Sequence, residues 1–435
     1  MPLTEKILRK LLPALLFSLT LQGQSQHLTP HPIQLANGKA LTLSLPASFT
    51  IDIAAQGLKC VRFMAMSPDN RVFVTDMHDR ADNVLGKVYI LDGWNEKAHT
   101  FARITPYLSH LRNPNNLAFY TEPAHDGKPA QAWLYLPLTD RLLRYRYSPG
   151  DDAPTGPPEV LAHYPDYGLN YKYGGWHLTR TIAFANLHGR TRLYLTVGSS
   201  CNACQEKEEV RATLTVMDPD GKHQEILAHG LRNAVGLNFI PSIDGGALFA
   251  TNMGADHLGD HDPEDTFFEL DSNARPIAPG SNYGWPTCYF DHGQPHPDPA
   301  VSAPKPTDHI VPPPPAGPPP LQFDCTKIPP VYTTFFAHSS PLGLEYFDSA
   351  NTALAGTFLV ALHGPSHPRI GTGYRVVRLS SNNRHPENFI TGFLVDGKVK
   401  GRPCGILSIG PDTFLLTDDL DGVIYFVHPA ASAIK

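Results

Sequence analysis

The chain has 435 residues, of which 41% are hydrophobic, 17% charged and 10% aromatic, and that apolar content excludes a chain disordered throughout. The 43 prolines and 35 glycines argue against a helix bundle, because both residues interrupt helices. The net charge of -6 provides no global basic field to attract nucleic acid, so no nucleic-acid partner is expected.

The N-terminal segment has the pattern of an export signal. Lys6, Arg9 and Lys10 precede an apolar stretch from Leu11 to Leu21, which is too short to span a bilayer comfortably. We expect residues 1–26 to be a signal peptide, with a mature chain beginning near His27 in the periplasm or outside the cell; a short amphipathic or core helix is the alternative. No later apolar run reaches about 18 residues, so no membrane span is expected.

Short runs rich in β-branched and aromatic residues then recur along the whole chain, separated by turn residues. They lie at residues 71–75, 132–136, 192–196, 247–250, 357–361 and 413–417. A second, weaker motif precedes each run and ends on a large apolar residue. Its six copies begin at Lys59, Arg112, His177, Arg232, Ser339 and Arg402.

These starts are separated by 53, 65, 55, 107 and 63 residues, and the longest gap contains a Pro-rich stretch. A repeated strand unit with variable connections predicts an all-β fold, a six-bladed β-propeller with long loops. We expect one domain over residues 27–435, with a Pro-rich insertion at about 291–322. The first strand of each blade would line the axis, so the six motif starts would meet at one mouth of the central channel.

The residues at those starts are mostly cationic, and His338 stands directly before Ser339. Several cations around a narrow opening favour an anionic ligand. The alternative is that each cation pairs with an acid on a neighbouring blade or lies in solvent. A register error of one residue would also turn a side chain to the other face of its strand.

The six cysteines fit an oxidising compartment, although fifteen complete pairings are possible. Cys288 and Cys325 flank the Pro-rich stretch, and a bridge between them would close that insertion at its base. Cys201 and Cys204 form a CxxC, for which we expect a small structural disulfide; a redox-active pair or half of a metal site is the alternative.

Several motifs together resemble the sorbosone dehydrogenase family, which is similar to the soluble glucose dehydrogenases that use pyrroloquinoline quinone (PQQ). The match runs from about Gly57 to Val427. Its motifs are Tyr173-Gly174-Gly175-Trp176-His177, residues 193–201, Gly230-Leu231-Arg232-Asn233, Asn282-Tyr283-Gly284-Trp285-Pro286, residues 392–397 and Gly401-Arg402-Pro403.

The resemblance implies a propeller that carries PQQ and calcium over the channel mouth and oxidises a sugar or sugar aldehyde. It implies His177 as the general base, Arg232 and Asn233 beside the cofactor, and Arg402 on the cofactor carboxylates. It also implies that the backbone carbonyls of Gly254 and Ala255 hold the calcium, and we add Asp256 to that metal set. Lys59, Arg112, His338 and His363 complete the candidate cofactor-binding residues.

This sequence departs from the glucose branch of the family in two places. That branch has a lysine within the strand that here reads 358–364, where His363 or Arg369 would have to replace it. It also has a proline at the position of Ala255, which does not alter a carbonyl ligand.

Two neighbouring features have competing interpretations. The acidic run from Asp256 to Asp265 is a second candidate calcium site or a solvated loop, and His257 and His261 within it are candidate transition-metal ligands. Trp176 and Trp285 would either form a wall of a sugar site or pack in the core.

A dehydrogenase of this type needs an external electron acceptor, because the chain has no CxxCH for a c-type haem. Two other functions compete with it. One is a calcium-dependent lactonase, against which the cationic mouth argues, and the other is a non-catalytic propeller that binds an anionic glycan or partner.

Overall fold

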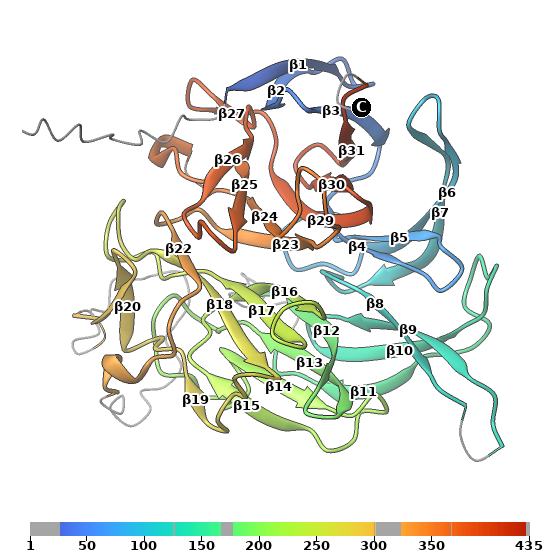
Figure 1. Cartoon of the computed structure of the whole chain (residues 1–435). Coiled ribbons are helices and arrows are strands. Elements are labelled where there is room, and N and C mark those ends of the chain that lie inside the picture. The colour runs from blue at the N-terminus through green and yellow to red at the C-terminus, as the bar shows by residue number, and fades with distance from the viewer. Residues whose placement is uncertain are drawn as a thin grey trace, which may run out of the picture.

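The computed structural model describes residues 27–124, 127–166, 177–299, 301, 323–366 and 368–431. The predicted signal peptide, Trp176 and residues 302–322 of the Pro-rich insertion lie outside these ranges. Six antiparallel sheets surround a central axis, as Figure 1 shows, and this confirms the all-β six-bladed propeller. No helix in these ranges is long and apolar enough to cross a membrane.

In the first five blades the strands follow one another outward from the axis in chain order. The first blade consists of β4 (Val61–Met66), β5 (Val72–Asp76), β6 (Gly86–Asn95) and β7 (Thr100–Leu111). The second blade consists of β8 (Ala118–Glu122), β9 (Gln131–Pro137), β10 (Arg141–Tyr147) and β11 (Glu159–His163). The third blade consists of β12 (Arg180–Leu187), β13 (Arg190–Val197), β14 (Thr213–Met217) and β15 (Glu225–His229), with β19 (Ser281–Asn282) added in parallel to β15.

The remaining three blades repeat this plan. The fourth consists of β16 (Ala234–Ile240), β17 (Ala247–Asn252), β18 (Asp265–Ser272) and β22 (Thr333–Phe335). The fifth consists of β23 (Pro341–Phe347), β24 (Thr357–Leu362), β25 (Arg375–Ser380) and β26 (Glu387–Ile390). The sixth consists of β29 (Pro403–Gly410), β30 (Thr413–Asp418), β31 (Val423–Pro429) and β3 (Phe49–Ala55).

The sixth blade closes the ring, because its outer strand β3 comes from near the N-terminus and pairs antiparallel with β31 near the C-terminus. Small elements decorate the six blades. They are the hairpins β1 (Leu28–Gln34) with β2 (Ala40–Pro46), β20 (Cys288–Asp291) with β21 (Gln294–Pro297) and β27 (Leu394–Val395) with β28 (Lys398–Val399), and the 3-10 turns η1 (Cys325–Lys327) and η2 (Pro368–Ile370).

The core consists of buried apolar side chains that fill the spaces between neighbouring blades. Aromatic rings from adjacent blades meet there, as Tyr135 and Phe184 do at a centroid distance of 4.8 Å, and as Phe249 and Phe358 do at 4.8 Å. Such pairs are typical of a propeller, in which each sheet buries both faces against its neighbours.

A buried threonine near the end of the second strand joins most blades to the next. Thr251 donates from Oγ1 to the carbonyl of Leu342 at 2.8 Å, and the same oxygen accepts the N–H of Gly236 at 3.0 Å. Gly236 lies where β16 bulges, so the hydroxyl satisfies a donor that the sheet leaves unpaired. The equivalent bonds run from Thr75 to Asn115, Thr139 to Leu178, Thr196 to Ala234 and Thr417 to Arg62.

Both predicted disulfides are present. Cys201 bonds to Cys204, and Cys288 bonds to Cys325 across the two ends of the Pro-rich insertion. Cys60 and Cys404 are buried and unbonded, near the starts of the innermost strands β4 and β29. Burial is the main cause that raises the pKa of both thiols, to about 12 for Cys404, so they are protonated at neutral pH.

Candidate functional site

The six motif starts all lie at the same end of the innermost strands. Lys59 precedes β4, Arg112 precedes β8, and Arg402 directly precedes β29. His177 and Arg232 stand before β12 and β16 in the same way. The strand order therefore brings these residues to one mouth of the channel, and the question becomes what each side chain contacts there.

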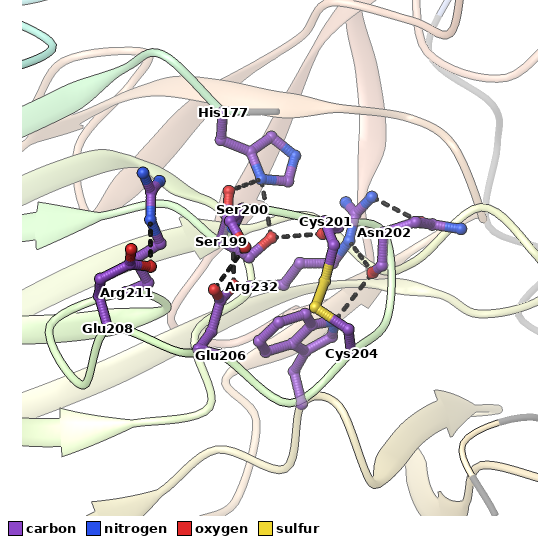
Figure 2. The surroundings of a disulfide bond; sticks show 11 residues. His177, Ser199, Ser200, Cys201, Asn202, Cys204, Glu206, Glu208, Arg211 and Arg232 are labelled. Atoms are coloured by element: carbon purple, nitrogen blue, oxygen red, sulfur yellow. Dashed lines mark hydrogen bonds and ion pairs between the residues drawn. A yellow bond between two sulfur atoms is a disulfide. The ribbon is translucent and has the colours of Figure 1, made fainter. Parts of the chain in front are cut away.

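His177 lies beside the disulfide-closed loop of the third blade (Figure 2). Its Nδ1 is 3.1 Å from the carbonyl oxygen of Ser199 and 2.9 Å from Ser199 Oγ. A carbonyl oxygen can only accept, so Nδ1 carries the proton and the basic lone pair is on Nε2. Burial, followed by the positive charge of Arg232, holds the pKa of His177 well below its usual 6.5. The imidazole is consequently neutral at neutral pH.

The loop from Ser199 to Cys204 supports His177 and Arg232 together. Ser199 Oγ donates to the carbonyl of Cys201 at 2.6 Å, and the disulfide closes the turn. The backbone carbonyl of Asn202 accepts Arg232 Nε at 2.8 Å and the indole N–H of Trp285 at 2.9 Å. The 9% exposure of Trp285 and this bond favour the packing interpretation of that residue over a sugar wall.

Arg232 is buried and surrounded by oxygen atoms. Its Nη1 donates to the carbonyl of Gly254 at 2.6 Å, and its Nη2 donates to Asn202 Oδ1 at 2.7 Å and to Asp256 Oδ2 at 3.0 Å. Burial lowers the pKa of the guanidinium, while the Asp256 charge opposes that shift. Two of the residues expected to hold calcium therefore contact a cationic side chain.

Asp256 also links Arg232 to His338. Asp256 Oδ1 is 3.2 Å from His338 Nδ1, and His338 Nε2 is 2.7 Å from the carbonyl of Gly259. Because both ring nitrogens face acceptors, His338 is an imidazolium, and the bond to Asp256 is the main cause that raises its pKa to about 9. Burial alone would raise the pKa of Asp256, but His338 and Arg232 lower it to about 2.

On the opposite blades, His363 and Arg402 belong to a second buried cluster. Arg402 Nη1 donates to the carbonyl of Gly364 at 2.8 Å and to His363 Nδ1 at 3.2 Å. His363 Nε2 lies 2.9 Å from both oxygens of Asp419, which also pairs with Arg62 at 2.5 Å. Since arginine only donates, His363 accepts at Nδ1 and is neutral, and its single N–H, on Nε2, donates a hydrogen bond to Asp419. Burial lowers the pKa of His363.

The remaining hydrogen bonds of the Arg402 guanidinium go to neutral oxygens. Its Nη2 donates to the carbonyl of Pro365 at 2.7 Å and to Tyr374 Oη at 3.3 Å. Among the residues that the structure describes, no carboxylate pairs with this guanidinium. Burial lowers the pKa of Arg402, and the nearby positive charge of Arg80 lowers it further.

The other predicted cations do not all face the opening. Arg112 is paired on both sides, with Asp82 at 2.6 Å and Asp166 at 2.9 Å. Lys59 is exposed, and Ser339 is buried at 1% exposure. The mouth therefore combines the two interpretations weighed from the sequence: Arg112 and Arg232 pair with acids, whereas Arg402 does not within the described ranges.

The acidic run divides into unlike parts. Asp265 is buried and accepts the backbone N–H groups of Gly254 at 2.7 Å and Ser340 at 2.7 Å, and burial raises its pKa to about 7. His257 pairs with Asp298 at 2.9 Å. In the described part of the chain, no group of three metal-binding side chains includes His257 or His261.

Several site residues were not found from the sequence. Arg62 and Asp419 lie outside the aligned motif starts, and Tyr374 lies on a loop between η2 and β25. Arg180, three residues after His177, is 1% exposed and donates to the carbonyl of His177 at 2.9 Å. The positive charge of Arg180 within a core strand was the one available signal, because arginine is seldom fully buried.

A family model described as TrAA12-like matches residues 44–391 of this chain. Among curated proteins, a protein of Borreliella burgdorferi that is itself uncharacterised is 28% identical over 246 residues, which is 54% of this chain. The match spans 57% of that relative's length.

Solved structures of similar fold include the PQQ domain of a pyranose dehydrogenase from Coprinopsis cinerea in its holo form. It is 16% identical with a TM-score of 0.65, covering 91% of this chain and 98% of that one. A calcium structure of the Trichoderma reesei carbohydrate-active enzyme of family AA12 is 16% identical with a TM-score of 0.64, covering 92% of this chain and 98% of that one. A glucose dehydrogenase is 16% identical with a TM-score of 0.54, covering 88% of this chain and 100% of that one. At these identities, the likeness establishes the fold.

Proposed function

Because the chain belongs to the TrAA12-like family, whose model covers residues 44–391, we propose that it is a PQQ-dependent dehydrogenase that oxidises a sugar or sugar aldehyde. The observation that carries the proposal is His177, a neutral imidazole fixed through Nδ1 at the channel mouth beside the Arg232 guanidinium. The printed descriptions of the similar structures support the same chemistry for those proteins.

The residues at the mouth fit an anionic quinone. PQQ has three carboxylates, and planar guanidinium groups bind carboxylates through two parallel hydrogen bonds. The Arg402 guanidinium contacts carbonyl, hydroxyl and imidazole partners but no carboxylate among the described residues, and Arg80 lies near enough to lower its pKa. These two arginines, with Tyr374 between the loops, are the residues that would hold the cofactor carboxylates.

The calcium set fits less well. The Gly254 carbonyl accepts Arg232 at 2.6 Å, and Asp256 Oδ2 lies 3.0 Å from the same guanidinium. A divalent cation placed on these oxygens would face a buried positive charge, and such repulsion is costly away from water. As the side chains are arranged, the group does not fit there, so we derive no step through calcium.

The chemistry assigned to this chain is proton removal. When bound, PQQ supplies a two-electron acceptor that takes the substrate carbon's hydrogen as hydride. His177 accepts the hydroxyl proton at Nε2, because Nδ1–H is held by Ser199. The lowered pKa keeps the imidazole neutral, and therefore Nε2 unprotonated, at neutral pH. A sugar hydroxyl carbon thereby loses a proton and a hydride and becomes a carbonyl group, whereas a sugar aldehyde reacts as its hydrate and becomes an acid.

The proposal extends to the setting of the reaction. An external carrier must reoxidise the cofactor, since the chain has no CxxCH. Two disulfides and the N-terminal export pattern support a periplasmic or secreted location.

The test is reconstitution of the full mature chain with PQQ and calcium, followed by dye reduction with aldoses and sorbosone. We expect turnover in the parent protein, and loss of at least about 100-fold in kcat for His177→Ala with cofactor binding retained. His188→Ala, which removes a histidine in the turn between β12 and β13, is the matched control. A folded protein that gives no turnover across the panel, or a His177→Ala variant that turns over normally, would refute the proposal.

A further inference from the structure

Three residues far apart in the sequence meet where the propeller ring closes. Asp52 lies in β3, His428 lies in β31, and His99 lies in the turn between β6 and β7. Asp52 Oδ2 is 2.8 Å from His99 Nδ1 and 3.0 Å from His428 Nε2. In Figure 1 the long β6–β7 hairpin of the first blade stands beside the β3 and β31 edge of the sixth blade.

A neutral His428 cannot donate to both of the acceptor oxygens that its ring nitrogens face. His428 Nδ1 is 3.0 Å from the carbonyl oxygen of Pro429, which can only accept. His428 Nε2 lies 3.0 Å from Asp52 Oδ2, and a carboxylate oxygen also accepts. Both ring nitrogens of His428 therefore face acceptor oxygens, but a neutral imidazole has only one N–H to donate.

A metal ion between His428 Nε2 and Asp52 removes this conflict. The imidazole would then keep its proton on Nδ1 for Pro429 and present the Nε2 lone pair to the ion. Metal-binding histidines commonly donate their second N–H to a backbone carbonyl in this way, which fixes the tautomer and the ring orientation.

The spacing of the three ligand atoms also suits an ion. All lie within 4.8 Å of one another. Around tetrahedral zinc, neighbouring ligand atoms are about 3.3 Å apart. The distances of 2.8 and 3.0 Å need to open by only a few tenths of an ångström.

Aromatic packing restrains the rings that would bind. The His99 ring stacks on Trp94 and meets Phe426 at a centroid distance of 5.1 Å. The side chains of His99, Asp52 and His428 are 29%, 43% and 18% exposed, so an ion could enter from solvent and keep water as a further ligand.

We propose that Asp52, His99 and His428 form a binding site for a divalent transition metal of the zinc class. Two imidazoles and one carboxylate are a common ligand set for such ions. The ion would join the β6–β7 hairpin to both strands at the closing edge of the ring. The site lies on the outer strands of the sixth blade, away from the channel mouth, and does not depend on the proposed dehydrogenase activity.

The experiment titrates Zn²⁺ into the untagged mature chain after removal of bound metal with a chelator, using calorimetry and thermal unfolding. We expect one tight equivalent per chain and a rise in the unfolding temperature. His99→Ala and Asp52→Asn should each weaken that binding by at least about ten-fold and abolish the rise. His188→Ala is the control, because His188 pairs with a single acid, Asp271, at 2.9 Å.

Bound Co²⁺ gives a second measurement, since its visible spectrum reports coordination by histidine nitrogen. The proposal fails if the parent chain binds no equivalent, or if the folded His99→Ala and Asp52→Asn variants bind as the parent does. The cluster would then be a hydrogen-bonded triad of two histidines and one aspartate without a metal.

Discussion

His177 acquires its orientation from small neighbours as well as from hydrogen bonds. Gly198 packs directly against His177. A Cβ at Gly198 would lie 2.6 Å from His177 Cβ and 2.7 Å from Asn233 Oδ1. These separations are shorter than van der Waals contact, so no side chain fits without moving the imidazole. The glycine in the motif of residues 193–201 is therefore required by close approach and not by backbone angles.

Gly198→Ala tests this contact. We predict a folded protein whose kcat falls at least about ten-fold, because a displacement of about 1 Å can cost a large factor in rate. Circular dichroism would establish folding, and PQQ titration would show whether the cofactor still binds. Gly156→Ala is the control, since nothing lies within 4 Å of a Cβ there. Unchanged kcat in Gly198→Ala would contradict the assigned role of His177.

His338 and Asp256 make stability depend on pH at the mouth. The folded pKa of His338 is about 9, above the unfolded value of 6.5, so its stabilising contribution is complete below 6.5 and is lost as the pH rises through about 9. The folded pKa of Asp256 is about 2, below 3.8, so its contribution is lost as the pH falls through that value.

We predict that the parent loses more stability than His338→Gln between pH 6.5 and pH 9. Urea unfolding at a series of pH values measures this difference. His385→Gln, on an exposed turn, is the control and should follow the parent. Parallel stability curves for the parent and His338→Gln would show that the His338–Asp256 pair contributes nothing.

At the residue scale, sequence reasoning located His177, Arg232 and Arg402 at the mouth because strand order alone decides which residues share that end. It did not identify Asp82 and Asp166, which neutralise Arg112, or Asp419, which connects His363 to Arg62. Those partners come from other loops and blades, and a pairing between distant loops leaves no spacing signal in one sequence.

Among the elements, the loop closed by Cys201 and Cys204 connects the two halves of the site. It contacts His177 through Ser199 and Arg232 through Asn202, as Figure 2 shows. The second disulfide, Cys288–Cys325, encloses a loop whose ends are 37 residues apart and lies at the insertion. The two bridges therefore have different expected consequences.

Replacing both Cys201 and Cys204 by serine should lower kcat substantially but reduce the free energy of unfolding only slightly. A loop this short contributes only about 2 kcal/mol in the chain-entropy model, whereas the longer loop contributes about 4 kcal/mol. The Cys288→Ser/Cys325→Ser variant is the comparison, and it should lose stability while keeping kcat. Denaturant unfolding and turnover measure both, and the reverse ranking of the two variants would contradict this account.

The threonine bonds between blades predict a measurable contribution to stability. Thr251→Val keeps the shape of the side chain but leaves the Leu342 carbonyl and the Gly236 N–H without their partner. A buried group left unpaired costs about 1–3 kcal/mol. Denaturant unfolding should show that loss, whereas Thr121→Val, at an exposed position of β8, should leave stability unchanged. A loss below about 0.5 kcal/mol would mean that these bonds are not what joins the blades.

The sequence was sufficient for the second strand of each blade, because each is a short apolar run followed by turn residues, and the weaker motif before each run marked the innermost strand. It did not predict the bulges that interrupt β4, β16, β23 and β29. A bulge follows from how the strand twists toward the axis, and periodicity over four to eight residues does not register one extra residue. Alignment also gives Ala361 in β24 where β30 has Thr417, so the fifth blade lacks this threonine.

For the whole molecule, the closing of the ring by β3 was not foreseen. Only the tertiary structure shows that residues 49–55 pair with residues 424–429. The same closure brings Asp52, His99 and His428 together, so the proposed metal site was equally invisible in the sequence.

The central claim is that the channel mouth binds an anionic quinone through arginine. Direct titration of the folded mature chain with PQQ, monitored by tryptophan fluorescence, tests this claim without requiring the substrate. We predict one saturable equivalent in the parent and at least about ten-fold weaker binding in Arg402→Ala, with Arg384→Ala as an exposed control. A folded parent that binds no PQQ, or an Arg402→Ala variant that binds PQQ as tightly as the parent, would contradict the account.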